Sequence, residues 1–410
     1  MKRIGGLGLL FLLLSPLLSG CWDSVDIENR ATVLGLAIDE AEPSTEQEED
    51  KNISHLEGVS SEPKGELIRL TAQIAVPGRI PLGPGTGEGE GEGGAGGSEP
   101  VWVLSVVGHT LDDAFNNLQQ EVAEELFLGH LRVIVINEEL AKKGVNRFND
   151  SLRRNPEVRR TAWMAISKEE AGTYMNIAPQ LEPVPTLYLA NMVDNSVELG
   201  KFPENFIGLF WRRLSSKGQD AFLPYLEIQS DENVQIDGLA YFKGDQMVGT
   251  IDPIEIGVYM ALTDYPEGGY GSIVTIPGTD TEVLDRSLTR QTKVKTTIDG
   301  GKPHIRVAIR YEFEIEEIGH GTANLSDAQV IKKIEEKQEE AIVQAAQGLI
   351  KKTQETGSDI FGFGEHIRAK HPGYWNQEIE TKERWQEMYK DVEVDVECMY
   401  HIRRVGMKAK

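Results

Sequence analysis

The chain has 410 residues, with 42 Lys and Arg against 66 Asp and Glu, which gives a formal net charge of −24 at pH 7. This acidic balance disfavours nucleic-acid binding and electrostatic attachment to anionic lipid, because both partners would repel the chain. With 40% hydrophobic residues, the chain is long enough for two or three domains, each with its own core.

The first 20 residues have the three parts of a secretory signal peptide: Lys2 and Arg3, an apolar run over 4–18, and small residues before Cys21. A transmembrane helix is the first alternative. However, a 15-residue helix at ~1.5 Å per residue reaches roughly 23 Å, less than the ~30 Å hydrocarbon core of a membrane. We therefore expect residues 1–20 to be removed as a signal peptide.

A cysteine directly after Leu-Ser-Gly distinguishes a lipoprotein signal from an ordinary signal peptide, which requires only small residues before the cleavage site. Residues 18–21 resemble the bacterial lipobox, which implies cleavage before Cys21 and a diacylglycerol on its thiol. Cleavage also removes Lys2 and Arg3, so the mature chain has a net charge of −26. Each buried CH₂ of the lipid contributes ~0.8 kcal/mol. The lipid, rather than charge, is therefore expected to hold the protein on the membrane.

Cys398 is the second cysteine, and it has no disulfide partner in the chain once Cys21 is lipidated. It alternates with Val396 and Tyr400 on the apolar face of a predicted strand. We expect a small buried hydrophobic residue there rather than a reactive thiol.

The expected N-terminal domain, residues 21–186, begins with strands at 33–38 and 68–76 on either side of an acidic insertion at 40–66. A second insertion, the Gly-Glu loop at 83–99, follows. This loop lacks the Gly-Lys-Ser/Thr sequence of a phosphate-binding loop, and its glutamates would repel phosphate, so we interpret it as a flexible acidic loop. Beyond it, hydrophobic periodicity predicts strands at 101–107, 131–137 and 161–167, and helices at 111–127, 138–152 and 168–177.

A Pro-rich segment at 182–186 marks the start of a small middle domain, residues 187–278. This domain is expected to contain a helix at 202–214. A hairpin follows, formed by strands 234–243 and 246–251. A segment rich in Gly and Pro then leads into the last domain.

The C-terminal domain, residues 279–410, has the clearest pattern. Apolar residues at every second position predict strands around 294–298, at 305–315 and at 392–402. A long helix is expected to begin at Ser326, whose spacing to Gln329 suits a capping box, and to end before Gly357. Its predicted apolar stripe is Val330, Ile334, Ala341, Ala345 and Leu349.

The expected fold class is therefore α+β with three domains. They are an N-terminal mixed α/β domain, a small middle domain, and a C-terminal antiparallel sheet packed by the long helix.

The eight histidines are scattered, and the chain has no HExxH, Cys-x-x-Cys or Gly-x-Ser-x-Gly motif. His366 and His371 are five residues apart, a spacing that does not place them on one helix face. We therefore expect no catalytic residue, no metal site and no cofactor, and we do not expect the protein to be an enzyme.

Arg153, Arg154, Arg159 and Arg160 form the strongest basic cluster of this acidic chain. They are interpreted either as a solvated surface paired with nearby acids or as a patch that docks an acidic loop of a partner. The Phe-Gly-Phe-Gly sequence at 361–364 also allows two interpretations: a tight turn with both rings in the core, which we favour, or an exposed binding loop.

Several ordered motifs resemble the Ger(x)C family of spore germination lipoproteins, the C subunits of germinant receptors. The resemblance begins with Cys-Trp-Asp at 21–23 and Ile-Glu-Asn-Arg at 27–30, and includes IRRVGM at 402–407. The motifs between them are GHTLDDAF at 108–115, GHLRVIVINEELAKKGV at 129–145, LRRNPEVRRTAWMAIS at 152–167, LPYLEI at 223–228, GLAYFKGDQMVGTID at 238–252 and SDIFGFGEHIRAKHPGYW at 358–375. The two acidic insertions depart from the pattern and look like enlarged variable loops.

The resemblance implies a three-domain α+β lipoprotein on the outer surface of the spore inner membrane. It would act with integral membrane A-type and B-type receptor subunits, with nutrients triggering germination. Two other classes of protein fit the sequence less well. A solute-binding lipoprotein of a transporter usually has two similar α/β lobes, and a cell-wall enzyme would need a catalytic motif. The receptor subunit is favoured.

Overall fold

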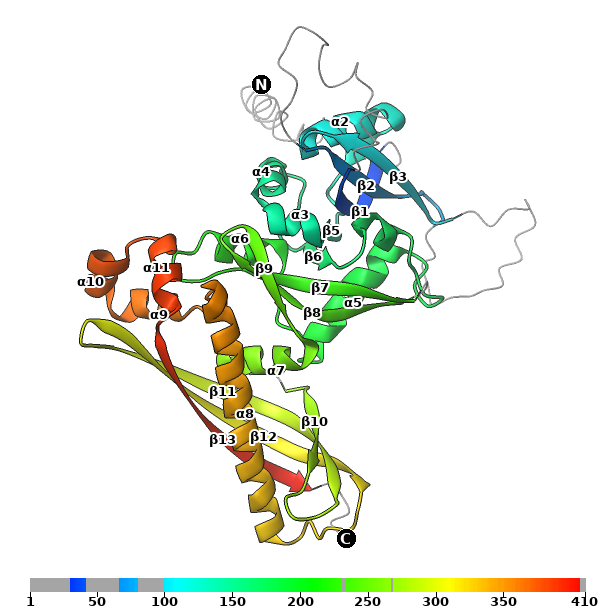
Figure 1. Ribbon diagram of the computed structural model, residues 1–410. Coiled ribbons are helices and arrows are strands. Elements are labelled where there is room, and N and C mark those ends of the chain that lie inside the picture. Colours follow the sequence, from blue (N-terminus) through cyan, green and yellow to red (C-terminus); the bar gives the residue numbers. More distant parts are fainter. Residues whose placement is uncertain (1–29, 42–65, 80–98, 231–232, 267, 406–410) are drawn as a thin grey trace, which may run out of the picture.

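The computed structural model describes residues 30–41, 66–79, 99–230, 233–266 and 268–405. It confirms the α+β class: a nine-stranded sheet belongs to the N-terminal part of the chain and a four-stranded sheet to the C-terminal part. Figure 1 shows the two sheets one above the other, with helix α7 (Pro253–Leu262) between them. The signal segment, Cys21 and most of both acidic insertions lie outside the described residues.

The large sheet has the strand order β3-β2-β1-β5-β6-β7-β8-β9, and β4 pairs with β1. Its central strands β1, β5, β6 and β7 are parallel, and antiparallel strands flank them on both sides. The strands are β1 (Arg30–Glu40), β2 (Ile68–Ala75), β3 (Val101–Gly108), β4 (Glu125–Phe127), β5 (Val133–Asn137), β6 (Trp163–Ser167), β7 (Phe222–Ser230), β8 (Asn233–Lys243) and β9 (Gln246–Ile251).

Helices cover both faces of this sheet, which explains why β5 and β6 are almost continuously apolar. Alternate strand residues enter two cores: Ile134 and Ile136 face one, and Val133 and Val135 face the other. The first core is completed by α2 (Leu111–Glu121), α3 (Glu138–Lys143), α4 (Asn146–Arg154) and α6 (Ile207–Leu214), and the second by the 3₁₀ helix η4 (Ala171–Met175), α5 (Pro185–Glu198) and α7.

Four predicted helices are shorter than the sequence suggested. Two of them are shorter at the ends: the helix expected at 168–177 is only η4, and the helix expected at 202–214 begins at Ile207. The helix expected at 111–127 ends at Glu121, because the residues from Glu125 form β4 beside β1. The helix expected at 138–152 is broken at Gly144, which has a left-handed φ of 121°. A Cβ at Gly144 would lie 2.8 Å from the Asp245 carboxylate in the β8–β9 turn, so the hairpin approaches the chain at this break.

The expected middle domain, residues 187–278, does not have a sheet of its own. Its strands β7, β8 and β9 extend the N-terminal sheet, because β7 pairs in parallel with β6 at Ile166 and Tyr225. The boundary predicted at 182–186 therefore lies between two strands of one sheet. The sheets divide the chain between β9 and β10 instead.

The small sheet has the order β10-β11-β12-β13. The predicted antiparallel pairing holds for β11 and β12, and β10, which falls in the expected connecting segment, also pairs antiparallel with β11. However, β13 is parallel to β12, so a wholly antiparallel sheet is wrong. A series of helices carries the chain back to the end of the sheet where β12 begins, which makes the last pairing parallel. These elements are β10 (Gly271–Thr275), β11 (Glu282–Asp299), β12 (Lys302–His320), α8 (Ala328–Thr356), α9 (Phe363–Lys370), α10 (Pro372–Tyr374), the π-helical turn η5 (Trp375–Ile379), α11 (Lys382–Tyr389) and β13 (Glu393–Val405).

Helix α8 lies across one face of the small sheet, as predicted (Figure 1). Its N-cap is Asp327, whose carboxylate accepts from Gln329 N at 2.8 Å, and it ends at Gly357 in the left-handed conformation. The predicted stripe is partly out of phase: Ala341 and Ala345 are exposed. The buried positions are Ile334, Ala346, Leu349, Ile350 and Thr353.

Cys398 packs against the core beneath α8, as the alternation predicted. Burial raises the pKa of its thiol to about 12, so the reactive thiolate is disfavoured at neutral pH. Within the described part of the chain, no helix combines the length and the apolar character needed to span a membrane.

Candidate functional site at the junction of the two sheets

The late motif at 358–375 follows α8 and packs against the loop between α6 and β7. The backbones touch at two glycines: a Cβ on Gly218 would lie 2.4 Å from the carbonyl carbon of Gly364. Glu365 N donates to Gly218 O at 3.0 Å across the same contact. The glycines of the motif therefore serve a close approach of two distant segments.

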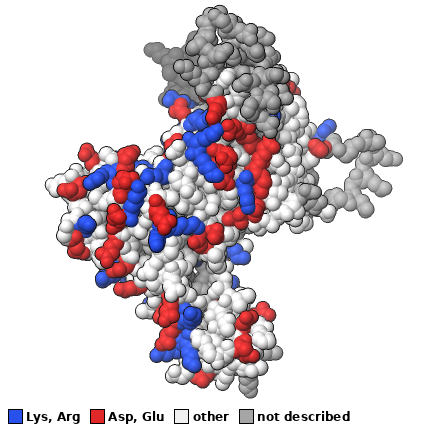
Figure 2. All heavy atoms as spheres, viewed as in Figure 1, with Lys and Arg blue, Asp and Glu red and all other residues white. Residues whose placement is uncertain are grey.

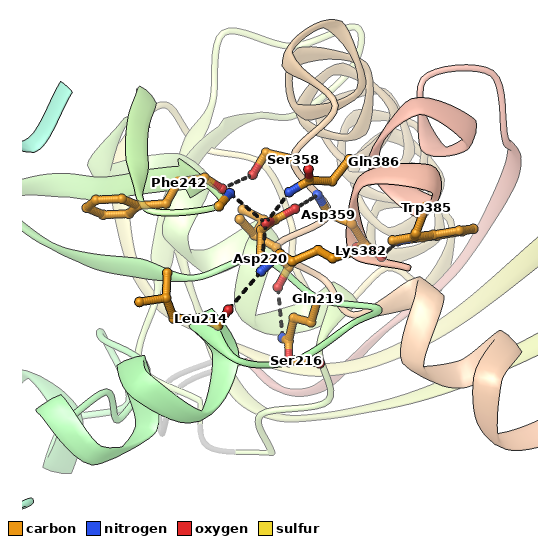
Figure 3. Close-up of polar contacts among 12 residues, drawn as sticks. Leu214, Ser216, Gln219, Asp220, Phe242, Ser358, Asp359, Lys382, Trp385 and Gln386 are labelled. Atoms are coloured by element: carbon orange, nitrogen blue, oxygen red, sulfur yellow. Dashed lines mark hydrogen bonds and ion pairs between the residues drawn. The ribbon is translucent and has the colours of Figure 1, made fainter. Parts of the chain in front are cut away.

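Asp359 lies beside Asp220 and Trp385 in this contact (Figure 3). It is 0% exposed, and its carboxylate accepts from Gly362 N at 2.9 Å, Gly364 N at 2.8 Å and the Trp385 indole at 3.0 Å. Gly362 has a φ of 78°, which bends the chain around the carboxylate. Burial raises the pKa of Asp359 to about 7, although the donors from Gly364 and Trp385 oppose the shift.

Asp220 is the second buried carboxylate of the junction and is 1% exposed. Its Oδ1 accepts from Gln386 Nε2 at 2.8 Å and Gly244 N at 3.2 Å, and lies 3.1 Å from the Lys382 ammonium. Its Oδ2 accepts from Asp359 N at 3.2 Å, and Asp220 N donates to Asp359 O at 2.7 Å. Burial raises the pKa of Asp220, and Lys382 opposes the shift.

Further contacts extend the junction on both sides. The Ser358 hydroxyl donates to Phe242 O at 2.6 Å, which ties the end of α8 to β8. Glu365 accepts from Gly218 N at 2.8 Å and from the Ser216 hydroxyl. These bonds hold the α6–β7 loop, the β8–β9 turn and the late motif together as one polar site.

Phe361 and Phe363 enter the core, which confirms the favoured interpretation of the Phe-Gly-Phe-Gly sequence. They are 5% and 0% exposed, and their ring centroids lie 5.2 Å apart. The motif thus combines two buried rings with a carboxylate that accepts backbone donors. Such an arrangement anchors one part of a protein on another rather than presenting a reactive group.

The four predicted arginines lie at the end of α4 and in the loop after it, and all four are exposed. Gly208 N of α6 donates to Arg160 O at 3.0 Å, and the Arg153 guanidinium lies 5.3 Å from the Trp211 ring. These contacts place α6 beside the cluster. Exposed Arg212, one helical turn after Gly208, therefore joins the cluster, which the sequence did not predict because about 50 residues separate the two segments.

The arginines differ in how they are neutralised. Arg154 pairs with Asp150 at 2.8 Å on an exposed surface. Partial burial of the guanidinium lowers the pKa of Arg153, and the nearby charge of Arg160 lowers it further. Over the face in Figure 2, Lys and Arg side chains lie among Asp and Glu. Among the residues that the structure describes, by contrast, Arg159, Arg160 and Arg212 have no ion pair.

His304 lies near two acidic residues of β13 at one end of the small sheet. His304, Glu393 and Asp395 are close enough to share a metal ion, but His304 Nε2 lies 3.0 Å from Asp395 and the two can pair directly. His371 Nε2 contacts the Thr296 carbonyl at 2.9 Å, which ties the late motif to β11.

Two family models match successive parts of the chain. The model for the spore germination protein N-terminal domain matches residues 23–228. The model described as spore germination B3/GerAC like, C-terminal, matches residues 237–406.

Curated relatives match over most of their length. Spore germination protein KC of Bacillus subtilis (strain 168) is 25% identical over 425 residues, covering 98% of this chain and 96% of the relative. Spore germination protein B3 of the same organism is 24% identical over 421 residues, covering 100% of both chains. Spore germination protein GerQC of Bacillus cereus is 26% identical over 314 residues, covering 76% of this chain and 85% of the relative.

The crystal structure of the GerBC protein has the same fold. The TM-score is 0.50 at 16% sequence identity, and the match covers 82% of this chain and 94% of that one.

Proposed function

The chain belongs to the GerAC-like family of spore germination proteins, and we propose that it is a lipid-anchored, non-catalytic C subunit of a spore nutrient-germinant receptor. The observation that carries this proposal is the order and extent of the family matches, which together run from residue 23 to residue 406 with one short gap. The chemistry of the junction supports a non-catalytic role, because its carboxylates are occupied by backbone and side-chain donors.

The proposed partners are integral membrane A-type and B-type receptor subunits, beside which this protein would act on the outer surface of the spore inner membrane. We propose that Cys21 carries the lipid anchor. We also propose that Arg153, Arg154, Arg159 and Arg160, joined by Arg212, dock an acidic loop of one of these subunits. The cations without an ion pair in the described structure support this choice, because an acidic loop would neutralise them.

The alternative, a solute-binding lipoprotein of a transporter, fits the structure less well. Two similar α/β lobes around a cleft are expected of such a protein. Here one sheet has a parallel centre with helices on both faces, and the other is mainly antiparallel with α8 on one face.

Replacing the proposed lipid site tests the anchor. In spores that produce Cys21→Ala, we expect the protein to move from the membrane fraction to the soluble fraction and nutrient germination to slow. A non-nutrient trigger should still work. Cys398→Ala is the matched control and should remain in the membrane fraction. A fully soluble Cys21→Ala protein that supports normal nutrient germination would contradict the anchoring proposal.

Charge reversal tests the docking surface. The double variant Arg159→Glu/Arg212→Glu is expected to recover about tenfold less of the membrane subunits from solubilised membranes, which corresponds to a loss of about 1.4 kcal/mol. Arg384→Glu on α11 carries an exposed charge reversal outside the cluster and should leave recovery unchanged. Equal recovery with the double variant and the wild type would exclude this surface.

A further inference from the structure

Asp220 and Asp359 form a buried pair of carboxylates in contact with a single cation. Lys382, whose side chain is 13% exposed, is the one basic residue in the described structure that pairs with either of them. If both carboxylates were ionised, the site would contain one negative charge without a partner. Burying such a charge is costly, so the closed junction favours retention of one proton.

The other lysines near the two carboxylates do not supply a second positive charge, because they bond elsewhere. Lys243 and Lys390 both pair with Glu387, at 3.7 Å and 2.9 Å. Lys217 bonds to the Glu380 carbonyl at 3.1 Å. The other titratable or charged groups near the junction are Arg213 on α6, Tyr241 on β8, Tyr259 on α7, Glu365, His366 and Arg368 on α9, and Glu383 and Tyr389 on α11.

We propose that Asp220 and Asp359 form a proton-sensitive latch, which holds one proton in the closed junction and opens more readily once that proton is lost. The raised pKa values of both carboxyls, which burial causes, agree with this assignment. The proposal does not depend on the proposed receptor function.

The latch is connected to the arginine cluster through α6. The Lys382 ammonium donates to Leu214 O at 3.2 Å, at the last residue of the helix that carries Arg212. The loop from 215 to 220 then leads directly into the carboxylate pair. Opening of the junction would release this end of α6 from α11. Proton loss would therefore loosen the contact between α11 and the end of the helix that carries Arg212.

The junction should open more readily as the pH rises, because the closed form binds the proton more tightly than the open form does. In the open junction an exposed aspartate has its ordinary pKa of about 3.9, whereas in the closed junction the pKa of Asp359 is about 7. Below the pKa of the open junction, the proton stabilises the closed form fully. This stabilisation is lost as the pH rises through the pKa of Asp359 in the closed junction. The opening constant should rise about tenfold per pH unit up to pH 7 and then level off.

Amide hydrogen exchange of residues 362–365 in the purified full-length chain tests the latch. After correction for intrinsic exchange rates, we expect the opening constant of the wild type to rise at least about tenfold from pH 5 to pH 7 and to change little from pH 7 to pH 8.5. Asp359→Asn removes a titrating group and should abolish the rise. His366→Gln removes a histidine on α9, a residue type that ordinarily titrates in the same range, and should keep the rise.

A further variant tests whether the carboxylate pair holds the proton, even if Asp359→Asn does not fold. Lys382→Met removes the single cation, so both carboxyls should hold their protons more tightly and the rise should continue to a higher pH. An opening constant equal at pH 5 and pH 7 in the wild type would overturn the proposal. So would a rise that survives in Asp359→Asn, or one that ends at the same pH in Lys382→Met.

Discussion

Two glycines allow the α6–β7 loop and the late motif to touch at the level of the backbone. A Cβ on Gly364 would lie 2.5 Å from the Trp385 indole nitrogen and 2.8 Å from Gly218 Cα. The second of these neighbours is backbone, which cannot move aside like a flexible side chain. Gly364 therefore allows the α6–β7 loop and the late motif to approach this closely.

We expect Gly364→Ala to lower the free energy of unfolding by about 1–3 kcal/mol, because the added methyl overpacks this contact. Gly348→Ala is the matched control: a Cβ there meets nothing within 4 Å, and the position is inside α8. That substitution should raise stability by about 0.4–1 kcal/mol. Urea unfolding measures both. An unchanged midpoint for Gly364→Ala would show that the contact is looser than described.

Some residues of the junction could be predicted from the sequence and others could not. The motif at 358–375 was recognised, and the entry of Phe361 and Phe363 into the core was expected. Asp220 was not predicted, because it lies 139 residues before Asp359 and no local pattern records a bond between them. Arg212 was missed for the same reason.

The long helix α8 has a clear apolar face, but its phase was predicted only in part. Ile334 and Leu349 are buried as expected, whereas Ala346 rather than Ala345 faces the sheet. Small residues weaken the hydrophobic signal, so neighbouring alanines cannot be assigned to a face from periodicity alone.

Neighbouring substitutions test the phase of α8. Ala346→Asp places a charge in the core and should lower the free energy of unfolding by about 3 kcal/mol or more. Ala345→Asp adds the same charge one residue earlier on the exposed side and should change stability by about 0.5 kcal/mol or less. Denaturant unfolding of the two variants gives the comparison. Equal losses of stability would mean that the helix is rotated from the orientation described.

Strands were predicted more completely than helices. Period-two alternation located β12 from Ile305 to Ile315, because one face of this sheet is buried beneath α8. The direction of β13 was wrong, since alternation is the same for parallel and antiparallel strands. Direction depends on how the intervening helices return the chain, which no local pattern contains.

At the scale of the whole molecule, the sequence predicts where most strands lie but not which strands pair with one another. The pairing of β6 with β7 joins segments separated by more than 50 residues and merges the expected middle domain into the N-terminal sheet. Sequence patterns assign a residue to a strand or helix, but they do not say which distant strand becomes its neighbour. The α+β class was nevertheless correct, because the number and type of elements already limit the ways to cover both sheets.

Germination of spores that lack this gene tests the receptor-subunit proposal most directly. The spores would be exposed to a panel of single nutrients and to a non-nutrient trigger, in a strain without related receptors. If the protein is a receptor subunit, these spores should lose the response to particular nutrients, and the wild-type gene should restore it, while the non-nutrient trigger still works. An unchanged response to every nutrient in that strain would contradict the receptor-subunit proposal.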